Sequence, residues 1–456
     1  DSNTTADNNV AIGQSALGAN TTGSDNTAVG KNAGLSVTTG LKNTLIGGLA
    51  GDALNTGSYN VALGMQALSA DTKGAKNVAI GQGALEAQNF TSATDSYNTA
   101  VGHFAGGSIT TGVENTLIGG LAGDAITTGV SNTGVGKSSV GATTTGDFNT
   151  GVGHGALLKN TTADGNTAVG YQALADNTTG FSNTALGKDA LGNTTTGDSN
   201  VSVGQNSMRT NTTGDDNVAV GQAALDANTT ADGNTAVGKS SLGANTTGNS
   251  NVAVGSFTLD ANTVGDRSVA VGYNALSTQN PASNVDMYNT AVGFNAGLSV
   301  TTGTNNTLIG GFAGDAITTG AENVAVGKSA LSASTTAANN VAIGQSALTT
   351  STTAANNVAI GYNAGLSVTT GASNTFVGGL AGDATDDGHS NTAVGYQALS
   401  ANCGYENTAV GINALISTTG IYNTSVGSGA GFDITSGGNN TCIGQGAGNT
   451  GNPGGA

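Results

Sequence analysis

The chain has 456 residues, of which 76 are Gly and only 2 are Pro, and 9% are charged. Its 28 acidic and 11 basic residues give a net charge of −17. No basic stripe is present that could neutralise phosphates, so nucleic acid is not an expected partner. No run of about 18 apolar residues occurs either, so no membrane-spanning helix is predicted.

One pentapeptide, seen as Asn26-Thr27-Ala28-Val29-Gly30, recurs 26 times between Asn9 and Asn440. The spacing is mostly 17 residues; it is 21 before Asn98 and Asn289, and 16 in two late repeats. A period of this length suits one coil of a parallel β-helix or β-roll. We therefore predict an all-β fold, a parallel β-solenoid of about 26 coils. It forms a single continuous repeat domain over residues 1–456, with four-residue coil insertions near 88–97 and 279–288.

The positions within a repeat differ in character. We number the first residue of each pentapeptide zero. Position zero is Asn in 25 copies, with Ser268 the exception. Position one is Thr or Val, position three is Val, Ile or Leu, and position four is Gly in all 26 copies. Branched side chains favour a strand, and Gly ends it. Stacked coils place the Asn residues above one another, which predicts a ladder of side-chain amides along the axis.

Alternation along the strand predicts which side chains face the core. Successive strand residues point to opposite faces. If position three points into the coil, so does position one, and position two points outward. Position two is then an uncharged outer stripe, mostly Ala, with Leu45, Leu117, Leu308 and Phe376. Such a stripe should be covered by another chain. We therefore predict a homo-oligomer with position two at its interface, which places Cys442 near the symmetry axis.

Two further features concern coil architecture. The sequence Gly-Gly-Leu-Ala-Gly-Asp begins at Gly47, Gly119 and Gly378, with a Phe variant at Gly310, and we expect these coils to form a bend or a surface bump. The chain begins at Asp1 in the middle of a repeat. This start fits a processed or excerpted product, which is either a slice of a longer fibre or a subunit whose ends stack on its neighbours.

The segment Asn166–Leu174, an Asn-Thr-Ala-Val-Gly core followed by Ala-Leu, resembles the head repeats of trimeric autotransporter adhesins. Ser268–Gly272 and Asn9–Gly13 are the closest matches to the Ser-Val-Ala-Ile-Gly of those repeats. The arrays are also similar to shaft repeats of tail-fibre-like proteins. The resemblance implies a left-handed parallel β-roll with three chains per rod. The period here is 17, longer than the family repeat, and these residues contain no heptad stalk, membrane anchor or chaperone domain.

No residue set points to catalysis, cofactor binding or metal binding. His103 and His154 follow the strand Gly, where other repeats carry Lys, Gln or Tyr, so we expect them at the surface; His389 has no partner suggesting a triad. The two cysteines, Cys403 and Cys442, lack metal-site spacing. A structural calcium ion at the Ala-Gly-Asp aspartates is the alternative to a solvated turn, but Asp52, Asp124, Asp315 and Asp383 lie one per coil in non-adjacent coils.

These observations predict a non-enzymatic extracellular or cell-surface structural fibre: an adhesin shaft, spacer or matrix filament. We expect it to self-associate as a homotrimer, and its ends to join where fibres are continuous. The alternative is a binding head of the adhesin or tail-fibre kind. In that case the loops of the long coils, Gln88–Tyr97 and Gln279–Tyr288, contact a receptor, a host surface or a glycan.

Overall fold

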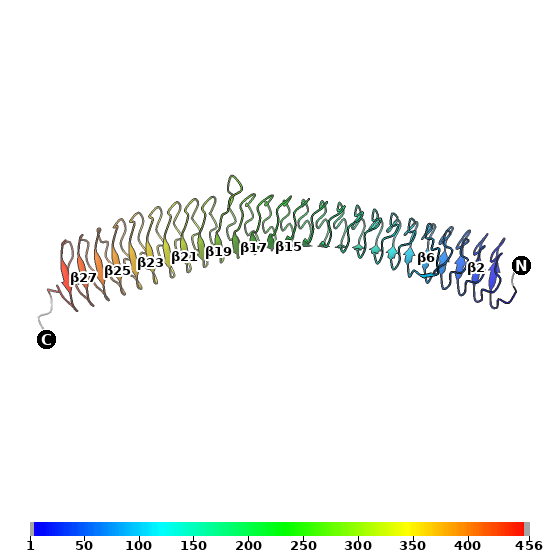
Figure 1. Cartoon of the computed structure of the whole chain (residues 1–456). Coiled ribbons are helices and arrows are strands. Elements are labelled where there is room, and N and C mark those ends of the chain that lie inside the picture. The colour runs from blue at the N-terminus through cyan, green and yellow to red at the C-terminus, as the bar shows by residue number, and fades with distance from the viewer. Residues whose placement is uncertain (1–3, 451–456) are drawn as a thin grey trace. The chain divides into compact units, whose positions relative to one another are not determined.

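The computed structural model describes residues 4–450, and they form a parallel β-solenoid of about 26 turns, roughly 17 residues apart, without a helix (Figure 1). The predicted fold class is therefore confirmed. The chain divides into two compact units, residues 1–230 and 231–456. Whether the whole chain behaves as one continuous domain stays a prediction.

Each coil contributes one three-residue strand to a parallel sheet. The strands of the first unit are β1 (Val10–Ile12), β2 (Thr27–Val29), β3 (Thr44–Ile46), β4 (Val61–Leu63), β6 (Val78–Ile80), β8 (Thr99–Val101), β9 (Thr116–Ile118), β10 (Thr133–Val135), β11 (Thr150–Val152), β12 (Thr167–Val169), β13 (Thr184–Leu186), β14 (Val201–Val203) and β15 (Val218–Val220). Those of the second unit are β16 (Thr235–Val237), β17 (Val252–Val254), β18 (Val269–Val271), β19 (Thr290–Val292), β20 (Thr307–Ile309), β21 (Val324–Val326), β22 (Val341–Ile343), β23 (Val358–Ile360), β24 (Thr375–Val377), β25 (Thr392–Val394), β26 (Thr408–Val410), β27 (Thr424–Val426) and β28 (Thr441–Ile443).

Neighbouring strands pair in identical register. Thr27 pairs with Thr44 and Val29 with Ile46, and the same phase holds across a long coil, where Val78 pairs with Thr99. Insertions therefore leave the sheet undisturbed and are taken up outside it. The first insertion adds a small parallel pair of its own, β5 (Gly74–Ala75) with β7 (Thr94–Asp95).

The sheet alternates as predicted, but with the opposite phase. Ala28 is fully buried, whereas its strand neighbours Thr27 and Val29 are half-exposed, and the same burial pattern recurs along both units. Position two therefore lines the core, and positions one and three face outward. The predicted interface through position two is wrong, and Cys442 lies inside its coil. The Asn residues decide the phase, because their buried amides need partners inside the coil and position two shares their side of the strand.

The coils that contain Ala-Gly are repacked internally. In the part of the chain that the structure describes, Leu45, Leu117, Leu308 and Phe376 are buried inside coils where position eight is Gly instead of Leu. A Cβ on Gly51 would lie 2.8 Å from Leu45 Cδ2, and one on Gly34, in the preceding coil, 2.7 Å from Leu45 Cδ1. One large side chain at position two thus fills the space left by two glycines. These coils exchange volume within the core, which accounts for the pattern that we had expected to produce a bend or a bump.

The Asn ladder is present and joins three parts of the fold. The backbone N–H of Asn43 donates to Oδ1 of Asn26 in the preceding coil at 2.9 Å, and Asn43 Nδ2 donates to the same oxygen at 3.0 Å. Asn43 Nδ2 also donates to the carbonyl of Gly57, fourteen residues on, at 3.0 Å. The ladder therefore joins successive coils and ties each strand start to the turn that closes its own coil.

Two glycine positions serve different steric needs. Gly30, at position four, has φ +141°, a conformation that few L side chains adopt. A Cβ there would lie 2.4 Å from the carbonyl oxygen of Gly47. Gly40, at position 14, does not have a positive φ, but a Cβ would lie 2.4 Å from the carbonyl oxygen of Gly57. Gly at position 14 therefore permits close approach of coils and not a special backbone angle.

Candidate functional site: the long coils and the sheet face

The first long coil is held from inside by a buried carboxylate. Asp71 is fully buried and accepts hydrogen bonds from the N–H of Gly74 at 2.9 Å and of Phe90 at 3.3 Å. Gln88 Nε2 donates to Asp71 Oδ2 at 2.7 Å, and Gln88 Oε1 accepts from Asn98 Nδ2 at 2.8 Å. The inserted residues thus leave and rejoin the coil at fixed points, which positions the loop on a rigid scaffold.

A cation, an aspartate and a tyrosine close each of the two long coils. Lys76 Nζ donates to Asp95 Oδ2 at 2.7 Å and to the Tyr97 hydroxyl at 2.8 Å, and it lies 4.9 Å from the centroid of the Tyr97 ring. These hydrogen bonds raise the pKa of Lys76. In the second long coil, Arg267 forms an ion pair with Asp286, and the Tyr288 hydroxyl donates to Asp286 Oδ2 at 3.0 Å. The sequence places these three residues at equivalent positions in the two coils.

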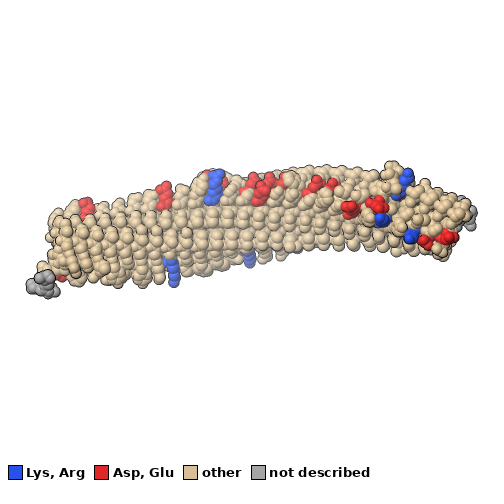
Figure 2. All heavy atoms as spheres, turned by 60° about the horizontal axis from the view of Figure 1, so that its bottom comes forward, with Lys and Arg blue, Asp and Glu red and all other residues tan. Residues whose placement is uncertain are grey.

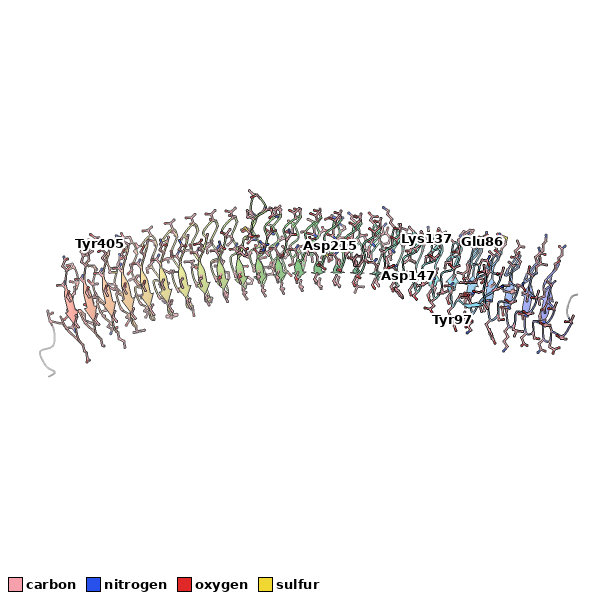
Figure 3. All side chains as sticks on the ribbon, viewed as in Figure 1. Glu86, Tyr97, Lys137, Asp147, Asp215 and Tyr405 are labelled. Atoms are coloured by element: carbon pink, nitrogen blue, oxygen red, sulfur yellow. The ribbon has the colours of Figure 1, made fainter. Side chains whose placement is uncertain are left out.

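The two loops differ beyond this shared contact. The loop before β19 projects from its coil (Figure 1), and its residues 282–285 are exposed. The loop of the first long coil instead lies beside a groove of about 500 Å³. Tyr97 lies on the strand side of its coil, away from Glu86 (Figure 3). The groove is lined by Thr56, Ser58, Tyr59, Lys73, Ala75, Lys76, Ala93, Thr94 and Asp95.

The outer face of the sheet is the second candidate surface. In each unit it consists of two rows, Thr or Val at position one and Val, Ile or Leu at position three. Leu186 is 48% exposed and Ile118 is 41% exposed. No charged residue occupies either row. Figure 2 shows a broad face without charged side chains, which lie along its margins.

The Ala-Gly-Asp aspartates do not converge. Among residues 4–450, no group of three or more His, Cys, Asp or Glu side chains is placed to hold a metal ion. Burial raises the pKa of Asp52, Asp124 and Asp315, opposed by backbone hydrogen bonds. Asp383 Oδ1 instead accepts a hydrogen bond from Ser400 Oγ at 2.5 Å. A structural calcium ion and a partly buried turn therefore both stay predictions for these aspartates.

The histidines and cysteines are dispersed. His103 and His154 are exposed, as expected from their position after the strand; His154 stacks on Tyr171 at 5.5 Å. His389 is also exposed and stacks on Tyr405 at 5.0 Å. Cys403 is buried, its Sγ lies 3.2 Å from Thr385 Oγ1, and burial raises the pKa of its thiol. These contacts are those of packed or surface side chains.

Compared with protein-family models and with curated proteins, the sequence gives no match. The parallel solenoid that the adhesin-like repeats imply is present, but membership of that family has no match to support it. The described residues contain no helix that is both long and apolar enough to span a membrane.

Of the groove lining, residues 93–95 lie within the loop Gln88–Tyr97 that the sequence predicts as a contact segment, whereas Thr56, Ser58, Tyr59, Lys73 and Lys76 are not predicted from it. A signal was available: the residue just before position zero is Lys42, Tyr59, Lys76 and Tyr97 in four successive coils. This alternation becomes visible only when each coil is aligned on its Asn and the position before the Asn is included.

Proposed function

We propose that the chain is a structural fibre element, a shaft or spacer outside the cell, that self-associates through the outer face of its sheet. The observation that carries the proposal is the complete absence of charge from positions one and three, although these side chains are half-exposed in both units. Elsewhere the coil surface does carry charge, for example Lys31 and Lys188 at position five. A large uncharged patch rimmed by polar residues is typical of a protein interface.

Area and spacing both favour another copy of the chain as the partner. Half-exposed side chains of the two rows extend over the 13 strands that each unit contributes to the sheet, and a stable interface buries about 800 Å² per partner. Successive strands in a sheet are about 4.8 Å apart. A second copy has the same spacing, so its rows stay in step along the sheet face of each unit, whereas a surface of another period would lose register. By resemblance to the adhesin repeats, we propose that the assembly is a trimer.

Charge introduced on the face tests the proposal. We expect Val135→Lys, Val152→Lys and Val169→Lys together to shift the chain to a lower mass in sedimentation or light scattering, because a buried, unpaired ammonium is costly. The matched control is Gln205→Lys with Gln222→Lys, since position five is exposed and carries Lys in other coils. A monomeric parent chain, or equal dissociation of both variants, would contradict the proposal.

A second candidate function is ligand binding by a long coil. The groove beside the first insertion favours it, because grooves with a few convergent polar groups are the usual form of a binding site.

A further inference from the structure

The groove beside the first long coil combines aromatic and cationic side chains on successive coils. Lys42 Nζ lies 5.5 Å from the centroid of the Tyr59 ring, and Lys76 Nζ lies 4.9 Å from that of Tyr97. Both tyrosines are 51% exposed. Tyr59 lines the groove and offers a ring surface to a ligand, while Tyr97 is held by Lys76.

The cations of the groove retain donors for a ligand. Lys73 Nζ donates to the carbonyl of Thr91 at 3.0 Å, and Lys76 Nζ donates to Asp95 and Tyr97. An ammonium group has three N–H donors, so Lys73 keeps two and Lys76 keeps one. Lys73 and Lys76 line the groove, and Lys42 lies over the ring of Tyr59, in a chain that has only 11 basic residues and a net charge of −17. Asp95 offsets one of these three positive charges, so a local positive excess remains in a chain that is acidic as a whole.

The remaining lining suits hydroxyl groups. Ser58 Oγ accepts from the Leu41 N–H at 3.0 Å and donates to the Thr56 carbonyl at 3.3 Å, and Thr94 Oγ1 donates to the Ser92 carbonyl at 3.1 Å. Both hydroxyls therefore keep lone pairs that can accept from a ligand hydroxyl, as does the Asp95 carboxylate. A volume of about 500 Å³ falls within the range of small-ligand sites and holds roughly two or three sugar rings. A pyranose ring presents an apolar face to an aromatic side chain and hydroxyls at its edge. A carboxylate on that ring pairs with an ammonium group.

The second long coil provides an internal comparison. It keeps the closing contact, with Arg267 and Asp286 in place of Lys76 and Asp95. Counted from the Asn of each coil, Val264 stands where the first has Lys73, Ser250 where it has Tyr59, and Gly233 where it has Lys42. The closing contact therefore does not require Lys73 or Tyr59, although Lys73 also holds the Thr91 carbonyl of the first loop.

We propose that the groove formed by Tyr59, Lys73, Lys76 and the 93–95 segment binds an anionic polysaccharide, a polymer of uronic acids. Tyr59 packs on a sugar ring, Lys73 pairs with a carboxylate, and Thr94 and Ser58 bind hydroxyls. This site deepens the second candidate function and does not depend on self-association, because the groove lies within one chain.

The test is a calorimetric titration of the full chain with a hexamer of galacturonate. A neutral glucose hexamer and inorganic phosphate are titrated separately as comparison probes. We expect the uronate to bind and the neutral hexamer to bind at least tenfold more weakly. Binding should weaken as salt is raised, because exposed charges are screened. Lys73→Gln and Tyr59→Ala should each weaken uronate binding about tenfold, which corresponds to one good contact.

Arg267→Gln in the second long coil is the control and should leave the affinity unchanged. Equal affinity for the neutral hexamer would overturn the proposal, as would uronate binding that Lys73→Gln or Tyr59→Ala leaves unchanged. Phosphate binding that displaces the uronate completely and ignores Tyr59→Ala would show a simple anion site instead. Mass measurements on the same samples separate this outcome from a failure of self-association.

Discussion

Leu45 and Gly51 should be coupled energetically, because they share one volume in the core. Leu45 is fully buried, and a Cβ on Gly51 would lie 2.8 Å from its Cδ2 and 2.9 Å from Leu54 Cδ1. Leu45→Ala alone leaves a cavity and should cost about 2–5 kcal/mol. Gly51→Ala alone should cost about 1–3 kcal/mol for overpacking. The positive φ of Gly51, +53°, adds about 1–2 kcal/mol to the cost of Gly51→Ala, because an L side chain is strained there.

The double variant should cost less than the sum of the two single changes. Shortening Leu45 removes one of the two contacts that oppose the new methyl group, and the methyl group fills part of the cavity. We expect a coupling free energy of about 1–2 kcal/mol in favour of the double variant, within the range for residues in contact. The control is Gly48→Ala, because a Cβ on Gly48 meets nothing within 4 Å and Gly48 does not have a positive φ.

Local hydrogen exchange is the suitable assay, since a solenoid need not unfold in a single step. The amide of Leu54 donates to the carbonyl of Gly51 at 3.2 Å, and the amide of Gly51 to that of Ala67 at 2.9 Å, so both report on this coil. Additivity of the two changes to within about 0.5 kcal/mol would refute the reasoning that position two and position eight exchange volume.

Three further outcomes follow from burial. Burial raises the pKa of Asp52, so the protonated carboxyl contributes stability that is present at acid pH and lost as pH rises. Asp52→Asn should therefore stabilise the chain at pH 7 by less than about 1 kcal/mol. The gap in melting temperature should close near pH 3, and a gap independent of pH, or an equal effect of Asp216→Asn at an exposed site, would contradict this. Asn200→Ala should lower the local stability of its coil by about 1–3 kcal/mol, because Asn200 donates to the Gly214 carbonyl at 2.8 Å and accepts from the Asn217 N–H at 3.0 Å. Equal amide hydrogen-exchange rates in Asn200→Ala and in the exposed Asn193→Ala would disprove it. Cys403 should react with a thiol reagent only on unfolding, since it is buried and burial raises the pKa of its thiol. Rapid labelling of the native chain, measured by mass spectrometry, would argue against this packing.

The chain's own repetition predicts much of the fold. Because the pentapeptide recurs at a fixed interval, the period, the number of coils, the strand positions and the Asn ladder are all readable from the printed residues. The sequence also predicts the role of Gly30 and its equivalents. A Gly that ends the strand in all 26 copies indicates a position where a side chain would clash with neighbouring backbone. The insertions near 88–97 and 279–288 are readable as interruptions of the period.

The sequence by itself determined the alternation of the strand, but only the tertiary structure decided its phase. A period of two shows that Thr27 and Val29 share a face and not which face is inside. Which face of the strand points into the coil depends on how much side-chain volume fits between the strand and the turn. Ala28 fits there beside an Asn amide that must be paired, so the larger Val29 lies on the outer face. Leu45 occupies the inner position because Gly34 and Gly51 make room for it. The groove is likewise tertiary in origin, because Tyr59, Lys73 and Asp95 meet only when three successive coils stack.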